Sequence, residues 1–296
     1  MKNVAILGPI SNEDVWNIPI SFYNHFVKLG FNTTFYNTLI DNKFKDDNLS
    51  KLISDYEQNI FVPDLILHLD FGFFNSPFLQ KSYIPTAKWV VESGDDPQNF
   101  KLNSSKILKG NFDLIMTPDI RCVPLYQQHN LNAVWCPYFA DPDQFDIEQE
   151  PIYDAVTTRS VEEPFFALLK NKLGNRFMPR SGDFFHGKAH SSHLKKGKIV
   201  IQNSKYKEIS RRIFEGMMAR RLVITDRPDP NTKIDLIFTE GKHIVYFDNV
   251  DDCIDKINYY SVHHEERETI ALNGYTKVTR HHTTSVRIKK ILEQLL

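Results

Sequence analysis

Four charged residues, Lys205, Glu208, Arg212 and Glu215, follow one another at spacings of three, four and three. If residues 206–220 form a helix, about 100° per residue places these side chains within an arc of roughly 80°. A helix N-terminus flanked by Lys205 and Arg212 can neutralise a diphosphate without a metal ion, and the Glu215 carboxylate can accept both hydroxyls of a ribose. A solvent-exposed, salt-bridged helix face explains the same spacing.

The position of this segment favours ligand binding. Residues 199–202, Ile-Val-Ile-Gln, read as a buried strand directly before it. The helix therefore begins at the carboxyl edge of a sheet, where open α/β sheets bind their ligands. Arg159 follows another predicted strand of the same half, and it reads equally well as a further phosphate ligand or as a salt-bridged surface residue.

Three acids in the first half form a second group that can do chemistry. Glu92, Asp95 and Asp96 belong to the segment ESGDDP that follows a buried strand predicted at 86–91. A carboxylate at such a strand end can act as general base on an acceptor hydroxyl. The alternative is that the acids only cap a helix that starts near Pro97. The sequence does not rank the three.

Two groups of residues have spacings that are compatible with metal binding, but we expect no metal site at either. Asp141 and Asp143 flank a proline in a polar linker segment, not directly after a predicted strand, and an Asp-Pro turn is expected there. His186, His190 and His193 would share one face of a helix, as zinc or iron ligands can. Glycine and serine around them weaken that helix, so a mobile loop that contacts donor or acceptor, or a plain surface segment, are the alternatives.

Two α/β halves must position these residues, because 296 residues fit two domains of about 150. Strands are predicted at residues 4–7, 33–36, 65–69, 86–91, 112–117, 133–136, 153–157, 199–202, 222–225 and 243–247. Helices are predicted at residues 19–29, 164–171, 206–220, 251–260, 265–273 and 283–296. Continuously apolar strands that alternate with helices are typical of parallel sheets covered on both faces.

This pattern predicts two Rossmann-like domains that face a central cleft. We expect the first at residues 1–145, a proline-containing linker over 137–151, and the second at 151–280. By fold-level analogy with other two-domain proteins of this architecture, and not from the pattern itself, the last segment, 281–296, is expected to cross back toward the first domain as a terminal helix.

Composition excludes several classes of protein. The net charge of −1 predicts no general attraction to nucleic acid or anionic membranes. No apolar run approaches the roughly 18 residues of a membrane span, and no signal peptide is apparent, so a cytoplasmic location is expected. Three widely spaced cysteines suggest neither zinc nor disulfides. The motifs of dinucleotide-binding enzymes, P-loop proteins and serine hydrolases are absent from the sequence.

Several segments resemble one family of enzymes. Residues 210–227, SRRIFEGMMARRLVITDR, resemble the S-x-R-x-F-E-x-x-A-x-G-x-L-L-x-T-D segment of CgeB-like (spore maturation protein-type) GT-B glycosyltransferases. Further matches occur in the family's order at PDLIL (63–67), WVVESGDDP (89–97), FDLIMTPD (112–119), WCPYFADPDQF (135–145) and HTTSVR (282–287). One position departs, because Arg220 or Arg221 stands where the family commonly has the glycine of A-x-G.

The resemblance implies the fold, the activity and the roles of several residues. It implies a GT-B fold in which Glu215 contacts the ribose and Arg212 the phosphates of a nucleotide-diphosphate sugar, and it adds His282 to the donor-binding residues. We expect glycosyl transfer with no cofactor beyond this donor and no essential metal. The acceptor is open among a glycan, a protein and a nucleic-acid base. The alternative function is a non-catalytic module that binds nucleotide sugars or a partner.

Overall fold

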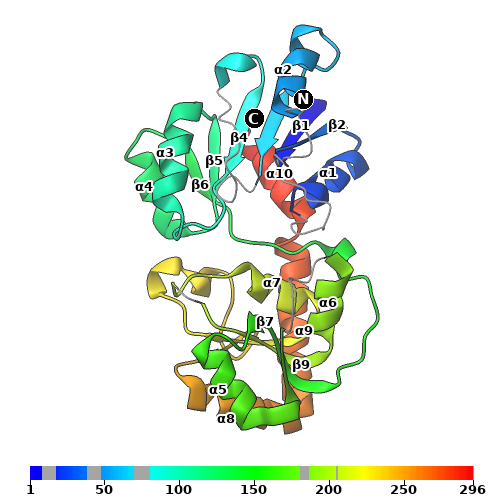
Figure 1. The fold of residues 1–296 in the computed structure, drawn as a ribbon, viewed down its shortest axis with the longest axis vertical. Coiled ribbons are helices and arrows are strands. Elements are labelled where there is room, and N and C mark those ends of the chain that lie inside the picture. Colours follow the sequence, from blue (N-terminus) through cyan, green and yellow to red (C-terminus); the bar gives the residue numbers. More distant parts are fainter. Residues whose placement is uncertain (9–17, 39–47, 70–80, 181–186, 205, 296) are drawn as a thin grey trace. The chain divides into compact units, whose positions relative to one another are not determined.

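The computed structural model describes residues 1–8, 18–38, 48–69, 81–180, 187–204 and 206–295. The chain forms two compact units. The first contains Met1–Pro137 and Thr284–Leu296, and the second contains Tyr138–Thr283. Each unit is built on one parallel β-sheet with helices packed against it (Figure 1). The prediction of two Rossmann-like α/β domains is confirmed.

The sheet of the first unit has the strand order β2-β1-β3-β4-β5-β6, and its neighbouring strands are all parallel. The strands are β1 (Asn3–Gly8), β2 (Asn32–Asn37), β3 (Leu65–His68), β4 (Lys88–Glu92), β5 (Leu114–Thr117) and β6 (Ala133–Trp135). The helices are α1 (Ile18–Lys28), α2 (Asn48–Glu57), α3 (Phe100–Gly110), α4 (Val123–Gln127) and α10 (Thr284–Leu295). All four residues of β3 and of β5 are buried, as expected of central strands whose first three residues are apolar.

Helix α10 brings the end of the chain into the first unit. The hydroxyls of Ser21 in α1 and Thr284 in α10 are 2.6 Å apart. The fully buried guanidinium of Arg287 donates to the carbonyl of Pro137 over 2.8 Å. Residues at both ends of the chain therefore stabilise the same unit.

The sheet of the second unit has the order β11-β10-β9-β7-β8, also with parallel neighbours. Its strands are β7 (Tyr153–Ser160), β8 (Phe177–Arg180), β9 (Gly197–Gln202), β10 (Leu222–Asp226) and β11 (Val245–Phe247). Its helices are α5 (Pro164–Leu173), α6 (Gly187–Lys195), α7 (Arg211–Met218), α8 (Val250–Val262) and α9 (His264–His281).

Helix α9 is longer than the predicted segment at 265–273. It runs through Gly274, a poor helix former that nevertheless lies in the helix interior. A Cβ at this position would lie 2.9 Å from the carbonyl oxygen of His243. The glycine is therefore required by the close approach of α9 to that backbone. Within the described part of the chain, no helix is long and apolar enough to cross a bilayer.

Candidate functional site

Helix α7 begins at Arg211, so the predicted start at residue 206 is wrong. Ser210 is the N-cap, and its hydroxyl accepts from the backbone N–H of Arg212 over 3.2 Å. Lys207 has a φ of 52°, which is incompatible with helix at this point. Glu208 thus precedes the helix, and its carboxylate accepts from the Tyr206 backbone over 2.8 Å. Of the predicted four-residue face, Arg212 and Glu215 lie on α7, Glu208 does not, and Lys205 lies outside the described residues.

The loop before α7 is tied to the carboxyl end of β10. Asp226, the last residue of that strand, is buried, and its carboxylate accepts from the backbone N–H of Ser204 over 2.7 Å and from the Ser204 hydroxyl over 2.9 Å. The Lys207 ammonium lies 3.0 Å from the same carboxylate. Asp226 therefore fixes where the helix begins relative to the sheet edge.

Gly216 allows α7 to lie directly on the sheet. A Cβ at this position would lie 2.8 Å from Val223 in β10 and 3.1 Å from Val200 in β9. The neighbouring Ile213, Phe214 and Met217 are fully buried. The polar residues of the first turns of α7 are consequently held at the carboxyl edge of β9 and β10, where a Rossmann-like domain binds ligands.

Glu215 is the most strongly paired acid of this region. Its side chain is 10% exposed, with one carboxylate oxygen 2.9 Å from Arg211 Nε and the other 3.0 Å from His190 Nε2. Burial by itself raises the pKa of Glu215, but the charges of His190, Arg211 and Arg212 outweigh it and hold the pKa well below its ordinary value. Glu215 is therefore an ionised, buried carboxylate beside three basic side chains.

Arg212 connects α7 to a third strand. Its Nε donates to the hydroxyl of Thr158 over 2.8 Å, near the carboxyl end of β7. The half-buried guanidinium thus lies at the edge where β7, β9 and β10 end. A guanidinium held beside a helix N-terminus is suited to bind a diphosphate.

The other predicted donor residues of the second unit have different surroundings. Arg159 lies within β7, and its side chain, 30% exposed, forms an ion pair of 2.8 Å with Glu163. His282 ends α9 and is buried, with ring centroids 5.2 Å from Phe214 and 5.9 Å from Phe238. It contacts α7 through Phe214, on the apolar side of the helix.

Over the residues that the structure describes, the histidine-rich segment forms helix α6, although the glycine and serine around it were expected to weaken a helix. His190 extends from α6 to Glu215, and His193 donates from Nε2 to the carbonyl of Thr157 over 2.8 Å. Burial lowers the pKa of His193, which favours the neutral ring. The two histidines therefore engage different partners, and His186 lies outside the described residues.

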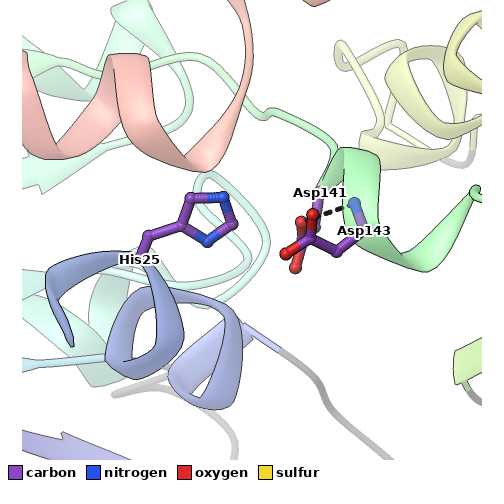
Figure 2. Close-up of side chains that lie close together, drawn as sticks. All are labelled: His25, Asp141 and Asp143. Atoms are coloured by element: carbon purple, nitrogen blue, oxygen red, sulfur yellow. Dashed lines mark hydrogen bonds between the residues drawn. The ribbon is translucent and has the colours of Figure 1, made fainter. Parts of the chain in front are cut away.

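Asp141 and Asp143 form the expected turn. The Asp141 carboxylate accepts from the backbone N–H of Asp143 over 3.0 Å, as Figure 2 shows, and caps a short 3-10 helix over Pro142–Gln144. His25, drawn in the same figure, belongs to α1, where its Nδ1 donates to the carbonyl of Ser21 over 2.8 Å.

The three acids of the first unit have unequal environments. Glu92 ends β4, is 7% exposed, and its charge acts on the buried guanidinium of Arg287. Asp95 is half-buried with a φ of 57°, a conformation that aspartate tolerates better than most residues. Asp96 is 3% exposed.

Asp96 connects four separate segments of the first unit. Its carboxylate accepts from the hydroxyls of Ser93 (2.5 Å), Thr117 (2.9 Å) and Tyr126 (3.0 Å) and from the amide of Asn103 (3.1 Å). Burial raises the pKa of Asp96 despite these four donors. This arrangement holds the loop after β4 against β5, α3 and α4.

Several residues of the second-unit site were missed in the sequence. Arg211 precedes Glu215 by one helical turn, so its ion pair could have been inferred from spacing. Asp226 is the last residue of the matched T-D motif. Thr158 and the pairing of His190 with Glu215 carry no local signal, because both contacts join segments that are distant in the sequence.

Comparison with known proteins supports the assignment of the fold. Residues 170–293 match the family model described as glycosyl transferase-like, and no curated protein sequence matches the chain. Sucrose-phosphate synthase from Thermosynechococcus elongatus is similar over 100% of this chain and 99% of its own, with a TM-score of 0.65 and 9% identity. HepE from Anabaena, solved in complex with UDP-glucose, covers 100% and 99%, with a TM-score of 0.64 and 11% identity. A glycosyltransferase from Rickettsia africae covers 99% and 97%, with a TM-score of 0.61 and 13% identity.

These similarities extend over the full length of both chains, whereas the family model covers most of the second unit and α10. At such low identity they concern the fold. The α7 site, from Arg211 to Glu215, lies within the matched residues. The chain therefore has the two-domain GT-B fold, and its C-terminal part resembles glycosyltransferases in sequence.

Proposed function

We propose that this protein is a glycosyltransferase of the CgeB-like type that uses a nucleotide-diphosphate sugar as donor. The observation that carries the proposal is the α7 site, where ionised Glu215 and Arg212 lie at the carboxyl edge of the sheet. This site falls inside the segment that matches the glycosyl transferase-like family. The similar protein HepE was solved with UDP-glucose, which favours a donor of the same class here.

Each part of the donor has a proposed partner in the second unit. Glu215 accepts hydrogen bonds from the two ribose hydroxyls, since the hydrogen bond from His190 occupies one lone pair on only one of its carboxylate oxygens. Arg212 and the first amides of α7 receive the diphosphate and stabilise its charge as the sugar leaves. Lys205 is a further proposed phosphate contact. Arg159 can contribute after exchanging Glu163 for phosphate, and His282 supports α7 from its apolar side.

We propose that these charges replace a metal ion at the diphosphate. A leaving diphosphate needs positive charge and hydrogen-bond donors at its oxygens, which guanidinium, ammonium and helix amides supply. Activity that survives EDTA is the expected result. A strict requirement for added Mg²⁺ or Mn²⁺ would contradict this part of the proposal.

The proposed general base is a carboxylate of the loop after β4. Among Glu92, Asp95 and Asp96, we favour Asp95, since Glu92 is buried near Arg287 and Asp96 is surrounded by four donors. A half-buried carboxylate can both reach a substrate hydroxyl and release the proton to water. The acceptor is a hydroxyl compound whose class the α7 site does not restrict.

Release of nucleoside diphosphate from nucleotide sugars, with water or a panel of acceptors, tests the activity. We expect release by the wild type and a loss of about 100-fold or more in Arg212→Ala, the range seen when a transition-state charge loses its partner. Glu215→Ala, which removes the proposed acceptor of the ribose hydroxyls, should lower kcat/KM by about tenfold or more. Lys172→Ala, an exposed change on α5, is the matched control and should retain full activity. Donor binding without release across all acceptors would favour the non-catalytic module instead.

A further inference from the structure

Glu215 is contacted by two basic side chains that come from different elements. Arg211 belongs to α7 itself, one turn before Glu215, whereas His190 reaches the carboxylate from α6. The Arg211 Nε lies 2.9 Å from the carboxylate but lacks the geometry of a hydrogen bond. Within the described part of the chain, the hydrogen bond that orients this carboxylate therefore comes from His190.

Hydrogen bonds hold helix α6 to the rest of the second unit, so α6 can fix the position of a side chain that contacts Glu215. One turn after His190, the His193 ring donates to the carbonyl of Thr157 in β7 over 2.8 Å. At the end of the helix, the Lys195 ammonium donates to the carbonyls of Phe145 (2.7 Å) and Ile147 (2.6 Å). The position of the His190 ring is therefore set by the contacts of α6 with the sheet as well as by its own contact with Glu215 in α7.

The hydrogen bond determines which lone pairs of Glu215 remain for a ligand. A carboxylate only accepts, so His190 Nε2 carries the hydrogen. One lone pair faces His190 on one oxygen and one faces Arg211 on the other. The remaining lone pairs, one on each oxygen, can accept from two neighbouring hydroxyls at once. Without His190 the carboxylate can rotate, and this paired arrangement is lost.

We propose that His190 is a positioning residue that makes Glu215 select ribonucleotides over 2′-deoxyribonucleotides. This inference rests on the proposed donor site and adds to it a residue that controls specificity. A site that hydrogen-bonds two hydroxyls discriminates against a ligand that lacks one only when the carboxylate is held in place. The ratio of the affinity for a ribonucleotide to the affinity for its 2′-deoxy form therefore measures how well the Glu215 carboxylate is oriented. The affinity for either nucleotide alone also depends on packing and charge.

Isothermal titration of the full-length protein with UDP, GDP, ADP and CDP, each against its 2′-deoxy form, measures this ratio. For the base that binds, we expect the wild type to prefer the ribonucleotide by about tenfold or more, the order of one charge-assisted hydrogen bond. His190→Leu, which keeps bulk but cannot donate, should bring the ratio to within about threefold. His190→Gln, which can donate, should restore most of it.

Controls separate positioning from folding. Lys188→Ala removes an exposed side chain of α6 two residues away and should leave the ratio unchanged. Melting temperatures show which variants fold. If His190→Leu does not fold, His190→Ala replaces it in the same titration.

Each further outcome has a defined meaning. Equal weakening of both nucleotides in His190→Leu, with an unchanged ratio, would overturn the positioning role and leave the donor site standing. Failure of the wild type to bind any of the eight nucleotides would overturn the donor site and the inference together.

Discussion

At the scale of single residues, the types that do chemistry were visible in the sequence while their partners were not. Glu215 and Arg212 could be singled out from helical spacing and motif resemblance. His190 and Thr158 contact them from α6 and β7, across 25 and 54 residues of sequence. Contacts of that range depend on how the elements pack, which one sequence does not encode in any local pattern.

Glu215 should make stability depend on pH in a defined direction. Its folded pKa lies below the value of about 4.3 expected in the unfolded chain. Its ionised form thus stabilises the fold above that pH, and this contribution is lost as the pH falls through the folded pKa. We expect Glu215→Gln to lower the melting temperature at pH 7 and to differ less from wild type near pH 3.5. A difference of the same size at both pH values would refute a stabilising ionised Glu215.

Asp96 should matter for stability more than its neighbour. Asp96→Ala removes four buried hydrogen bonds, including the one that the Tyr126 hydroxyl donates, at a cost of about 3 kcal/mol or more. Asp95→Asn keeps a residue that tolerates positive φ and should change stability by less than about 0.5 kcal/mol. Thermal unfolding of both variants measures this contrast. Equal losses would show that the four hydrogen bonds are not what holds the loop after β4.

At the scale of elements, strong apolar periodicity was read well and helix ends were read poorly. The helix predicted at residues 19–29 corresponds to α1, and Gly30, just beyond it, adopts the left-handed conformation with a φ of 84°. The predicted start of α7 at residue 206 is too early. Ser210 is the N-cap, and its hydroxyl accepts a hydrogen bond from the first turn of the helix. Strand β8 is short and contains Pro179, which is not expected within a central strand, so the sequence gives no signal for it. In the structure β8 is an edge strand, where proline is tolerated.

The end of α7 contains the position at which the sequence departs from the CgeB-like motif that it resembles. Arg220 follows the C-cap residue Ala219 and has a φ of 56°, where glycine is favoured. Arg220→Gly should therefore stabilise the protein by about 0.5–1 kcal/mol and raise the melting temperature by about 1–3 °C.

The neighbouring arginine provides the matched control. The guanidinium of Arg221 donates to the carbonyls of Lys195 and Gln149, each over 2.9 Å, so Arg221→Gly should lower the melting temperature. A lower melting temperature in Arg220→Gly would contradict the assignment of strain to that residue.

Position 216 should not tolerate any residue larger than glycine, because α7 packs closely on the sheet there. In Gly216→Ala the new methyl group meets Val223 and Val200 at 2.8 and 3.1 Å, so α7 must move away from the sheet. We expect a loss of about 1–3 kcal/mol, despite the better helix propensity of alanine. Thermal unfolding measures this loss, and an unchanged or higher melting temperature would show that α7 does not pack as closely as described.

At the scale of the whole molecule, the sequence was sufficient to predict two parallel α/β domains, though not every strand of the second sheet. Strands with apolar runs, such as residues 65–67 and 222–224, are buried on both faces, which identifies parallel α/β architecture without any knowledge of the chemistry. Strand order, by contrast, is set by crossover connections, and the sequence alone did not specify that β7 lies between β8 and β9.

The measurement that tests the central claim most directly is thermal stabilisation by UDP-, GDP-, TDP- and CDP-linked sugars. A ligand that binds the folded state raises the melting temperature according to its concentration and affinity. We expect at least one of these donors to do so in the wild type and to lose the effect in Arg212→Ala. If none of them stabilised the wild type at millimolar concentration, the nucleotide-sugar site at α7 would be contradicted.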